Sequence, residues 1–197
     1  MIENRNFDQN FWNERYLLNE TGWDLAQVSP PLKAYIDQLT NKNLRILIPG
    51  CGNSYEAEYL LQNGFTDITI IDIAPALVNR LKSKFQSNRN VEIVLGNFFT
   101  HKAEYDLVLE QTFFCAINPE LRKSYVEAMA GLLAVGGKLA GVLFNKEFET
   151  LGPPFGGKST EYQTLFKDAF NFKTFEQCNN SFHKRADSEL FVILEKK

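Results

Sequence analysis

The stretch LRILIPGCG, from Leu44 to Gly52, decides the fold of this chain of 197 residues. Its apolar run is too short for a helix and ends at Pro49 and Gly50, so it predicts a buried strand. A helical pattern follows from Tyr55 to Asn63. A buried strand that leads through a glycine turn into a helix is typical of an α/β fold with a parallel sheet.

The same alternation continues along the chain and predicts further βα units. Asn118 and Pro119 suit the first positions of a helix. The last two strands are close enough in sequence to form an antiparallel pair. We expect strands at 67–72, 91–96, 105–110, 138–144, 172–178 and 189–196, and helices at 32–40, 74–85, 119–133 and 161–169, after a first short helix in the N-terminal segment 1–40.

Length and composition limit the possible classes of protein. With 44% hydrophobic residues the chain can form one domain, 1–197, without disulfides. A net charge of −3 without long charged runs argues against a nucleic-acid or membrane partner, and no signal peptide or spanning segment is evident. The widely spaced cysteines indicate neither a disulfide framework nor a metal site. We therefore expect a cytoplasmic protein without a metal.

The glycine turn and a later carboxylate form a nucleoside-binding pattern. Gly50 and Gly52 allow a tight turn and the close approach of a ligand. Asp72 stands twenty residues beyond Gly52, at the end of the second predicted strand, where a carboxylate can bind both hydroxyls of a ribose. NAD and S-adenosylmethionine both contain that ribose, so these residues alone leave both cofactors open.

The position after the glycine turn separates the two cofactors. A dinucleotide-binding turn has a third glycine, which brings the pyrophosphate to the helix N-terminus. This chain has Tyr55 there, and it has no Tyr-x-x-x-Lys pair of the kind that some dehydrogenases use. The sequence therefore favours S-adenosylmethionine, and an NAD-dependent oxidoreductase remains an alternative.

The ends of the third and fourth predicted strands add candidate binding residues. Asn97 can hydrogen-bond an adenine edge, and Phe98 can cover the adenine face. The segment 110–116, EQTFFCA, follows the fourth strand and should line the floor where a sulfonium and its methyl acceptor meet. Aromatic side chains suit this position because ring faces attract a cation.

Several motifs resemble the thiopurine S-methyltransferase family, and within it the branch of thiol and halide methyltransferases. They are FWNERY at 11–16, GWD at 22–24, IPGCG at 48–52, IDIAP at 71–75, GNFF at 96–99, TFFCAINPELR at 112–122 and GPPF at 152–155.

The resemblance implies a class I, Rossmann-like methyltransferase fold. Its sheet has seven mostly parallel strands in the order 3-2-1-4-5-7-6, strand 7 is antiparallel, and helices cover both faces. It also implies that Trp12, Tyr16 and Trp23 in the segment 1–40 cover the cofactor. Core anchoring of two helices is the alternative role of these three residues. Together with the candidates above, the predicted cofactor-binding residues are Trp12, Tyr16, Trp23, Gly50, Gly52, Asp72, Asn97, Phe98, Glu110 and Gln111.

Two departures from the thiopurine enzymes bear on the acceptor. Gln111 stands where those enzymes have an arginine, and Arg185 is near, but not at, the place of a second one before His183. We expect Gln111 and Arg185 to act in catalysis, and Phe113, Phe114, Phe155 and the loop 145–160 to contact the acceptor. The expected substrate is a small thiol, hydrosulfide, thiocyanate or a halide.

The expected reaction is an in-line displacement that leaves S-adenosylhomocysteine. A thiol of ordinary pKa is partly ionised near neutral pH, so the reaction needs no strong base. Alternatives are a thiopurine acceptor, a small O- or N-nucleophile with Glu110 or His183 as base, and a protein that binds S-adenosylmethionine without catalysis. A small-molecule acceptor is the expected partner, and the chain is expected to be a monomer or a weak homodimer.

Overall fold

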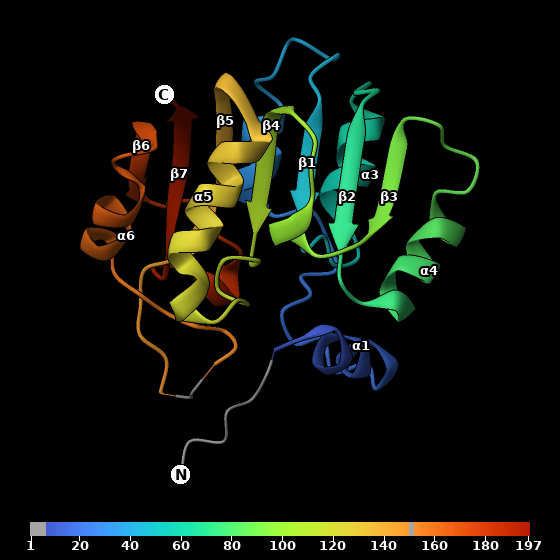
Figure 1. The fold of residues 1–197 in the computed structure, drawn as a ribbon, viewed down its shortest axis with the longest axis horizontal. Helices are drawn as coiled ribbons and strands as arrows, with labels where there is room; N and C mark the ends of the chain where they lie inside the picture. The colour runs from blue at the N-terminus through green and yellow to red at the C-terminus, as the bar shows by residue number, and fades with distance from the viewer. Residues whose placement is uncertain (1–6, 150–151) are drawn as a thin grey trace.

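The computed structural model describes residues 7–149 and 152–197. Its centre is a seven-stranded sheet in the order β3-β2-β1-β4-β5-β7-β6 (Figure 1). Strands β1 to β5 pair in parallel, and β7 is antiparallel to both β5 and β6. The predicted class I methyltransferase fold is therefore confirmed. The strands are β1 (Ile46–Pro49), β2 (Ile68–Asp72), β3 (Val91–Leu95), β4 (Tyr105–Gln111), β5 (Leu133–Phe144), β6 (Phe170–Gln177) and β7 (Glu189–Lys196).

Helices cover both faces of the sheet, and each face has its own apolar core. One core joins the sheet to α5 and α6, and the other joins it to α2, α3 and α4. In Figure 1, α5 and α6 lie in front of the sheet and α3 lies behind it. The helices are α1 (Gln9–Leu17), α2 (Pro30–Ile36), α3 (Tyr55–Gln62), α4 (Pro75–Lys84), α5 (Arg122–Leu132) and α6 (Ser159–Phe166), with short 3₁₀ turns at Phe98–Thr100, Pro119–Leu121 and His183–Arg185.

Helix α1 lies across the end of the sheet at which β1 and β2 terminate (Figure 1). Asp8 caps it, because its Oδ1 accepts the backbone N–H groups of Asn10 and Phe11. Asn13 accepts the N–H of Ala76 at 2.8 Å and so joins α1 to the start of α4. The segment before the first βα unit therefore covers the edge where parallel sheets bind ligands.

Several element boundaries differ from the sequence-based expectation: α2 ends at Ile36 rather than 40, α6 ends at Phe166 rather than 169, and two further differences have a visible cause. Strand β5 begins at Leu133 rather than 138, because Leu133 already pairs with Tyr105 before the register shifts. Gly136, with φ +74°, lies within this irregular part of the strand instead of in a turn before it. The helix expected from Pro119 starts as a 3₁₀ turn, in which Asn118 Oδ1 accepts the N–H of Glu120 at 3.0 Å.

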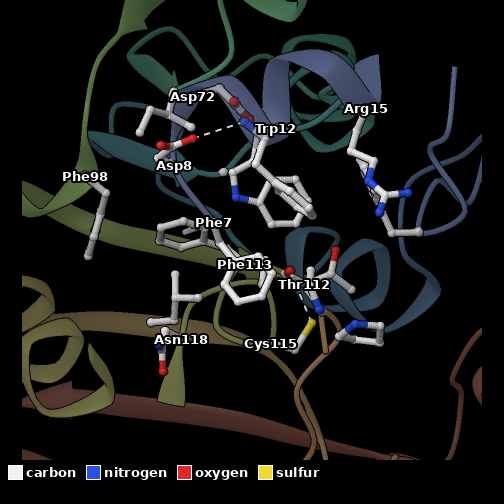
Figure 2. Close-up of a pocket in the computed structure, with 18 of the residues that line it drawn as sticks. Phe7, Asp8, Trp12, Arg15, Asp72, Phe98, Thr112, Phe113, Cys115 and Asn118 are labelled. Atoms are coloured by element: carbon white, nitrogen blue, oxygen red, sulfur yellow. Dashed lines mark hydrogen bonds between the residues drawn. The ribbon is translucent and has the colours of Figure 1, made fainter. Parts of the chain in front are cut away.

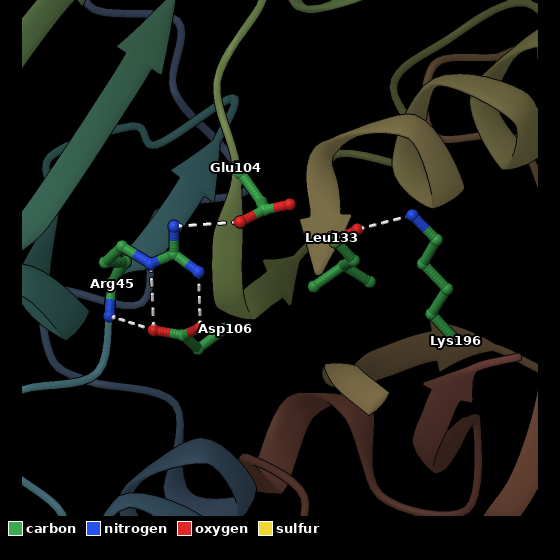
Figure 3. A network of polar contacts seen from close by, with 5 residues as sticks. All are labelled: Arg45, Glu104, Asp106, Leu133 and Lys196. Atoms are coloured by element: carbon green, nitrogen blue, oxygen red, sulfur yellow. Dashed lines mark hydrogen bonds and ion pairs between the residues drawn. The ribbon is translucent and has the colours of Figure 1, made fainter. Parts of the chain in front are cut away.

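Polar contacts tie together the opposite end of the sheet (Figure 3). Arg45, just before β1, donates to both carboxylate oxygens of Asp106 and to Glu104. Lys196 Nζ donates to the carbonyl of Leu133 at 2.6 Å and thereby joins the end of β7 to the start of β5. These contacts lie far from α1 and leave the carboxyl ends of the strands free for a site. Among residues 7–149 and 152–197, no helix is long and apolar enough to cross a membrane.

Candidate active site

A cavity of about 780 Å³ opens at the carboxyl ends of the parallel strands. Figure 2 shows side chains from several elements pointing into it, among them Trp12, Asp72 and Phe113. Its wall combines the ends of β1, β2, β3 and β4 with α1 and with part of the loop after β5. The predicted site residues within this wall are Trp12, Tyr16, Trp23, Gly50, Asp72, Asn97, Phe98, Phe113 and Arg185.

Asp72 ends β2 and supplies a nearly buried carboxylate to the cavity wall, with 7% of its surface exposed. Its Oδ1 accepts the N–H of Ala74 at 2.9 Å. Burial raises the pKa of Asp72 to about 6, although the backbone N–H groups of Ala74, Gly52 and Ile73 favour the charged form. A partly satisfied carboxylate in this position can accept hydrogen bonds from ligand hydroxyl groups.

The glycine turn after β1 makes close contacts within the protein. Gly50 and Gly52 both have positive φ, +55° and +52°. Gly50 lines the cavity, but a Cβ atom there would meet the ring of Phe113 rather than open space. Gly52 lies outside the described cavity wall. A Cβ atom at this position would lie 3.9 Å from the hydroxyl oxygen of Tyr16. The turn therefore lets a neighbouring side chain approach closely.

Five aromatic residues of the N-terminal segment, which we call the aromatic cover, line one side of the cavity. Their rings contact one another edge to face at centroid distances of 5.1 to 5.7 Å. Tyr16 is buried, and burial is the main reason that its pKa lies far above the usual value. The aromatic cover consists of Phe7, Phe11, Trp12, Tyr16 and Trp23.

The end of β3 contributes an amide and a ring to the cavity. Asn97 Oδ1 accepts the N–H of Phe99 at 2.9 Å and so caps the following 3₁₀ turn. Phe98 is 4% exposed and contacts Phe113 edge to face, with ring centroids 5.2 Å apart. Both residues line the cavity, so a flat ligand between them would meet one polar group and one apolar face.

Glu110 lies in the interior, outside the described cavity wall, although the sequence suggested a cofactor contact. Its carboxylate accepts the N–H groups of Phe113 and Phe114 and the hydroxyl of Tyr125, at 2.7 to 3.0 Å. Burial raises the pKa of Glu110 to about 7. The two amide contacts hold the turn after Thr112, whose positive φ of 59° is unfavourable for a β-branched residue. Glu110 therefore positions the wall of the cavity.

Two neighbours of Glu110 also lie outside the described wall. Phe114 is 1% exposed and packs in the core against Tyr125, Tyr162 and Phe166. The side-chain amide of Gln111 is buried and has no hydrogen-bond partner among the residues that the structure describes. A buried amide without a partner is uncommon and costs free energy.

The other side of the cavity is formed mainly by apolar groups, with the polar side chains of Thr112, Asn118 and Glu120 beside them. Phe155 stands outside the described wall, yet its ring contacts Phe7 of the aromatic cover, with centroids 5.4 Å apart. Its N–H donates to the carbonyl of Cys115 at 2.7 Å. Of the expected loop 145–160, residues 150–151 lie outside the described ranges. The lining residues on this side are Cys115, Ala116, Ile117, Phe144, Pro153 and Pro154.

Arg185 lines the cavity with a guanidinium that is already engaged. Its Nη2 donates to the carbonyl of Trp23 at 2.7 Å, and its Nη1 lies 3.5 Å from Oε1 of buried Glu189. His183, considered as a base, lies in the same 3₁₀ turn, outside the described wall, with its ring 4.3 Å from that of Phe182. Arg185 thus joins two distant parts of the chain at the edge of the site.

The sequence did not single out several lining residues. Phe7 and Phe11 belong to the aromatic cover, and Arg15 pairs with Glu20 at 2.6 Å at the cavity edge. Phe11 and Arg15 are four residues apart on one face of α1, and Phe7 directly precedes the Asp8 cap, so the spacing and the cap could have identified them. Among the described residues, no group of three or more His, Cys, Asp and Glu side chains could hold a metal ion.

Comparisons with known proteins agree with this geometry. A family model described as Thiopurine S-methyltransferase (TPMT) matches residues 7–196. A probable thiol methyltransferase 2 of Arabidopsis thaliana is 29% identical over 159 residues, covering 78% of this chain and 70% of the relative. A thiopurine S-methyltransferase of Vibrio cholerae (strain O395) is 28% identical over 176 residues, covering 81% of each.

Solved structures share the fold at low sequence identity. A 1,6-didemethyltoxoflavin-N1-methyltransferase of Burkholderia thailandensis, with bound S-adenosylhomocysteine, aligns with a TM-score of 0.75 at 16% identity, covering 96% of this chain and 87% of that chain. The magnesium protoporphyrin IX methyltransferase of Synechocystis, with bound S-adenosylmethionine, aligns with a TM-score of 0.74 at 14% identity, covering 96% and 95%. These likenesses concern the fold.

Proposed function

Because the chain belongs to the thiopurine S-methyltransferase family and is thus an S-adenosylmethionine-dependent methyltransferase, we propose that it methylates a small thiol, hydrosulfide, thiocyanate or halide in the cavity described above. One observation carries this proposal: a single cavity joins the Asp72 carboxylate at the end of β2 to an apolar side that includes Cys115, Ala116 and Pro153. The first part suits a nucleoside, and the second suits a soft acceptor.

The residues around Asp72 fit S-adenosylmethionine. The carboxylate would accept hydrogen bonds from the ribose hydroxyls, and Asn97 and Phe98 would contact the adenine. The aromatic cover would lie over the positive sulfonium, which ring faces attract. Tyr55 supports this choice over NAD, because it begins α3 where a dinucleotide-binding turn would need a glycine, and its hydroxyl donates to Asp24 at 3.3 Å.

When bound, S-adenosylmethionine supplies a methyl group on a positively charged sulfur, and the acceptor forms a bond to this carbon while the carbon–sulfur electron pair returns to the sulfur. The protein's own part is to orient and to exclude water. Phe113 holds its place because Glu110 fixes the amide of Phe113 and Gly50 leaves room for the ring. The aromatic cover and Phe155 meet at Phe7 and shield this space.

The acceptor side favours nucleophiles that need no strong base. Of the carboxylates that line the cavity besides Asp72, Asp8 caps α1, Glu20 is paired with Arg15, and Glu120 is exposed on the surface. An apolar pocket favours weakly hydrated anions, since their desolvation costs less than that of a hard oxyanion. Thiolates, thiocyanate and iodide have this property. The relative named a probable thiol methyltransferase supports the same class.

A thiopurine acceptor is the second candidate. The Vibrio cholerae relative carries that name, and a cavity of about 780 Å³ is large enough for a bicyclic acceptor beside the cofactor. The sequence argues against it, because the arginine that the thiopurine enzymes have at this place is here Gln111, whose neutral amide lies outside the described cavity wall.

Turnover with a panel of acceptors decides between these candidates. We would measure kcat/KM for iodide, bromide, chloride, thiocyanate, hydrosulfide, a small aryl thiol and a thiopurine, corrected for the ionised fraction of each acceptor. Soft, small nucleophiles should react fastest. If a thiopurine reacts faster than every small acceptor, thiopurine methylation replaces the proposal, and if none of these acceptors is methylated, the acceptor belongs to another chemical class.

A further inference from the structure

Trp23 of the aromatic cover is attached to the body of the protein through its main chain. The ring faces the cavity and contacts Trp12 and Tyr16. The carbonyl group accepts a hydrogen bond from Arg185, which is 162 positions away in the chain. The same residue therefore belongs to the cavity wall and to a contact with the segment between β6 and β7.

The Arg185 guanidinium is held firmly on its own side. It lies 3.5 Å from Glu189, whose side chain is 3% exposed at the start of β7. Its central carbon lies 5.5 Å from the ring centroid of Phe144, at the end of β5. A buried ion pair rarely stabilises a protein more than apolar side chains of the same size would. Stability alone therefore does not account for a charged group at this position.

The residues after Trp23 are tied to the glycine turn independently of Arg185. The Asp24 carboxylate accepts hydrogen bonds from Asn53 and from Tyr55, and it also accepts the N–H of Ala26 at 2.7 Å. The N–H of Ser29 donates to buried Glu56 at 3.0 Å. Segment 24–29 is thus a fixed attachment, whereas residues 17–20, at the end of α1 and just beyond it, are exposed on the surface.

From this arrangement we propose that Arg185 is a positioning residue that latches the aromatic cover over the cofactor and thereby controls how fast S-adenosylhomocysteine leaves. The inference rests on the proposed location of the cofactor in this cavity. Trp12, Tyr16 and Trp23 have to move before a bound nucleoside can leave past them. The Arg185–Trp23 hydrogen bond opposes that movement, because opening the cover would leave a buried charge with one partner fewer.

The chain carries its own reporter for this movement. Trp12 and Trp23 are its only tryptophans, and both belong to the aromatic cover. Their fluorescence therefore follows the cover alone. In a stopped-flow experiment on the full chain, bound S-adenosylhomocysteine is displaced by excess S-adenosylmethionine or diluted out. The change in tryptophan fluorescence then gives the rate at which S-adenosylhomocysteine is released.

Three variants test the latch. Arg185→Met combined with Glu189→Gln removes the hydrogen bond together with the carboxylate that pairs with Arg185, while the nearby buried carboxylate of Glu56 keeps the N–H of Ser29. Arg185→Lys keeps a cation beside Glu189 but lacks the planar group that serves both partners. Arg45→Met is the matched control, since it removes a paired arginine at the opposite end of the sheet (Figure 3).

We expect the double variant to release S-adenosylhomocysteine about tenfold faster than the natural chain, the scale of one hydrogen bond to a charged group. The release rate of Arg185→Lys should lie between those of the natural chain and the double variant. Arg45→Met should release S-adenosylhomocysteine at the natural rate. KM for S-adenosylmethionine should rise with the release rate, while the thermal midpoints of the folded variants should not follow it. If the double variant fails to fold, the release rate of Arg185→Lys tests the proposal in its place.

Release at the natural rate from folded Arg185 variants would overturn the latch while leaving the proposed function intact. Faster release from Arg45→Met to the same degree would also overturn it, since the effect would then be a general loss of stability. If the natural chain binds no S-adenosylhomocysteine at all, the proposed location of the cofactor fails first, and the latch fails with it.

Discussion

Gly50 packs against the ring of Phe113 so closely that a Cβ atom at position 50 would lie 2.3 Å from Phe113 Cδ2. The turn after β1 and the turn after β4 therefore leave no space between them. Phe113 in turn contacts Phe98 from the end of β3. Three strand ends thus meet at Phe113, and the contact between the ends of β1 and β4 depends on the absence of a side chain at Gly50.

Gly50→Ala should disturb this contact and the left-handed backbone at the same time. The left-handed backbone alone should lower the free energy of unfolding of the alanine variant by about 1–2 kcal/mol. We expect weaker binding of S-adenosylhomocysteine by calorimetry and a lower thermal midpoint. Adding Phe113→Ala should recover part of the binding loss in Gly50→Ala. Strict additivity of the two single effects would show that the contact does not matter.

Asp72→Ala should leave the sheet folded and weaken the binding of S-adenosylhomocysteine by roughly 1.5–3 kcal/mol, the scale of hydrogen bonds to a charged group. Calorimetric titration measures this change, and far-UV circular dichroism checks the fold. Asp106→Ala is a suitable control, because this carboxylate pairs with Arg45 at the other end of the sheet. Unchanged affinity in folded Asp72→Ala would exclude Asp72 as the ribose ligand.

The affinity for S-adenosylhomocysteine should fall as the pH drops below about 6. Burial raises the pKa of Asp72 to about 6, so acidification protonates the carboxylate that would accept the ribose hydroxyls. The loss should approach tenfold per pH unit. Asp72→Asn should lack this pH dependence, and a natural chain whose affinity stays flat from pH 7 to 5 would contradict the assignment.

The free energy of unfolding of the ligand-free protein should depend on pH with the opposite sign. Because the folded pKa of Asp72 lies above the ordinary value of 3.8, the folded state binds the proton more tightly than the unfolded state does. The contribution of this group to stability is therefore present below about pH 4 and is lost as the pH rises through about 6. The difference in thermal midpoint between the natural chain and Asp72→Asn, followed from pH 4 to 7, measures this contribution.

Deletion of residues 1–24 should abolish methyl transfer and leave the sheet folded, because it removes the aromatic cover but no strand. Circular dichroism, thermal unfolding and calorimetry with S-adenosylhomocysteine would follow the result. Deletion of residues 1–6 alone is the control, since all described lining residues remain. If the longer deletion unfolds the protein, the cover is a structural support rather than a lid.

The sequence predicted the order of the elements because strands and helices have local signals. LRILIP, the glycine turn and Asp72 define a βα unit without any knowledge of distant contacts. The same reasoning could not place Glu110 and Phe114. A strand end tells which residues reach the site edge, but the direction of each side chain depends on α5, where Tyr125 draws the Glu110 carboxylate inward. Contacts such as that between Arg185 and Trp23 join segments that are far apart in the sequence, and no local sequence pattern predicts such a contact.

The thiol of Cys115 stands in the wall of the cavity in which the proposed methyl transfer takes place. Burial raises its pKa to about 12, so that the thiol stays protonated at neutral pH. If the acceptor is a soft nucleophile, as proposed, burial thereby protects the protein's own thiol from the same methyl donor. Self-alkylation would add 14 mass units per event, and the intact mass of the protein should stay constant through prolonged turnover.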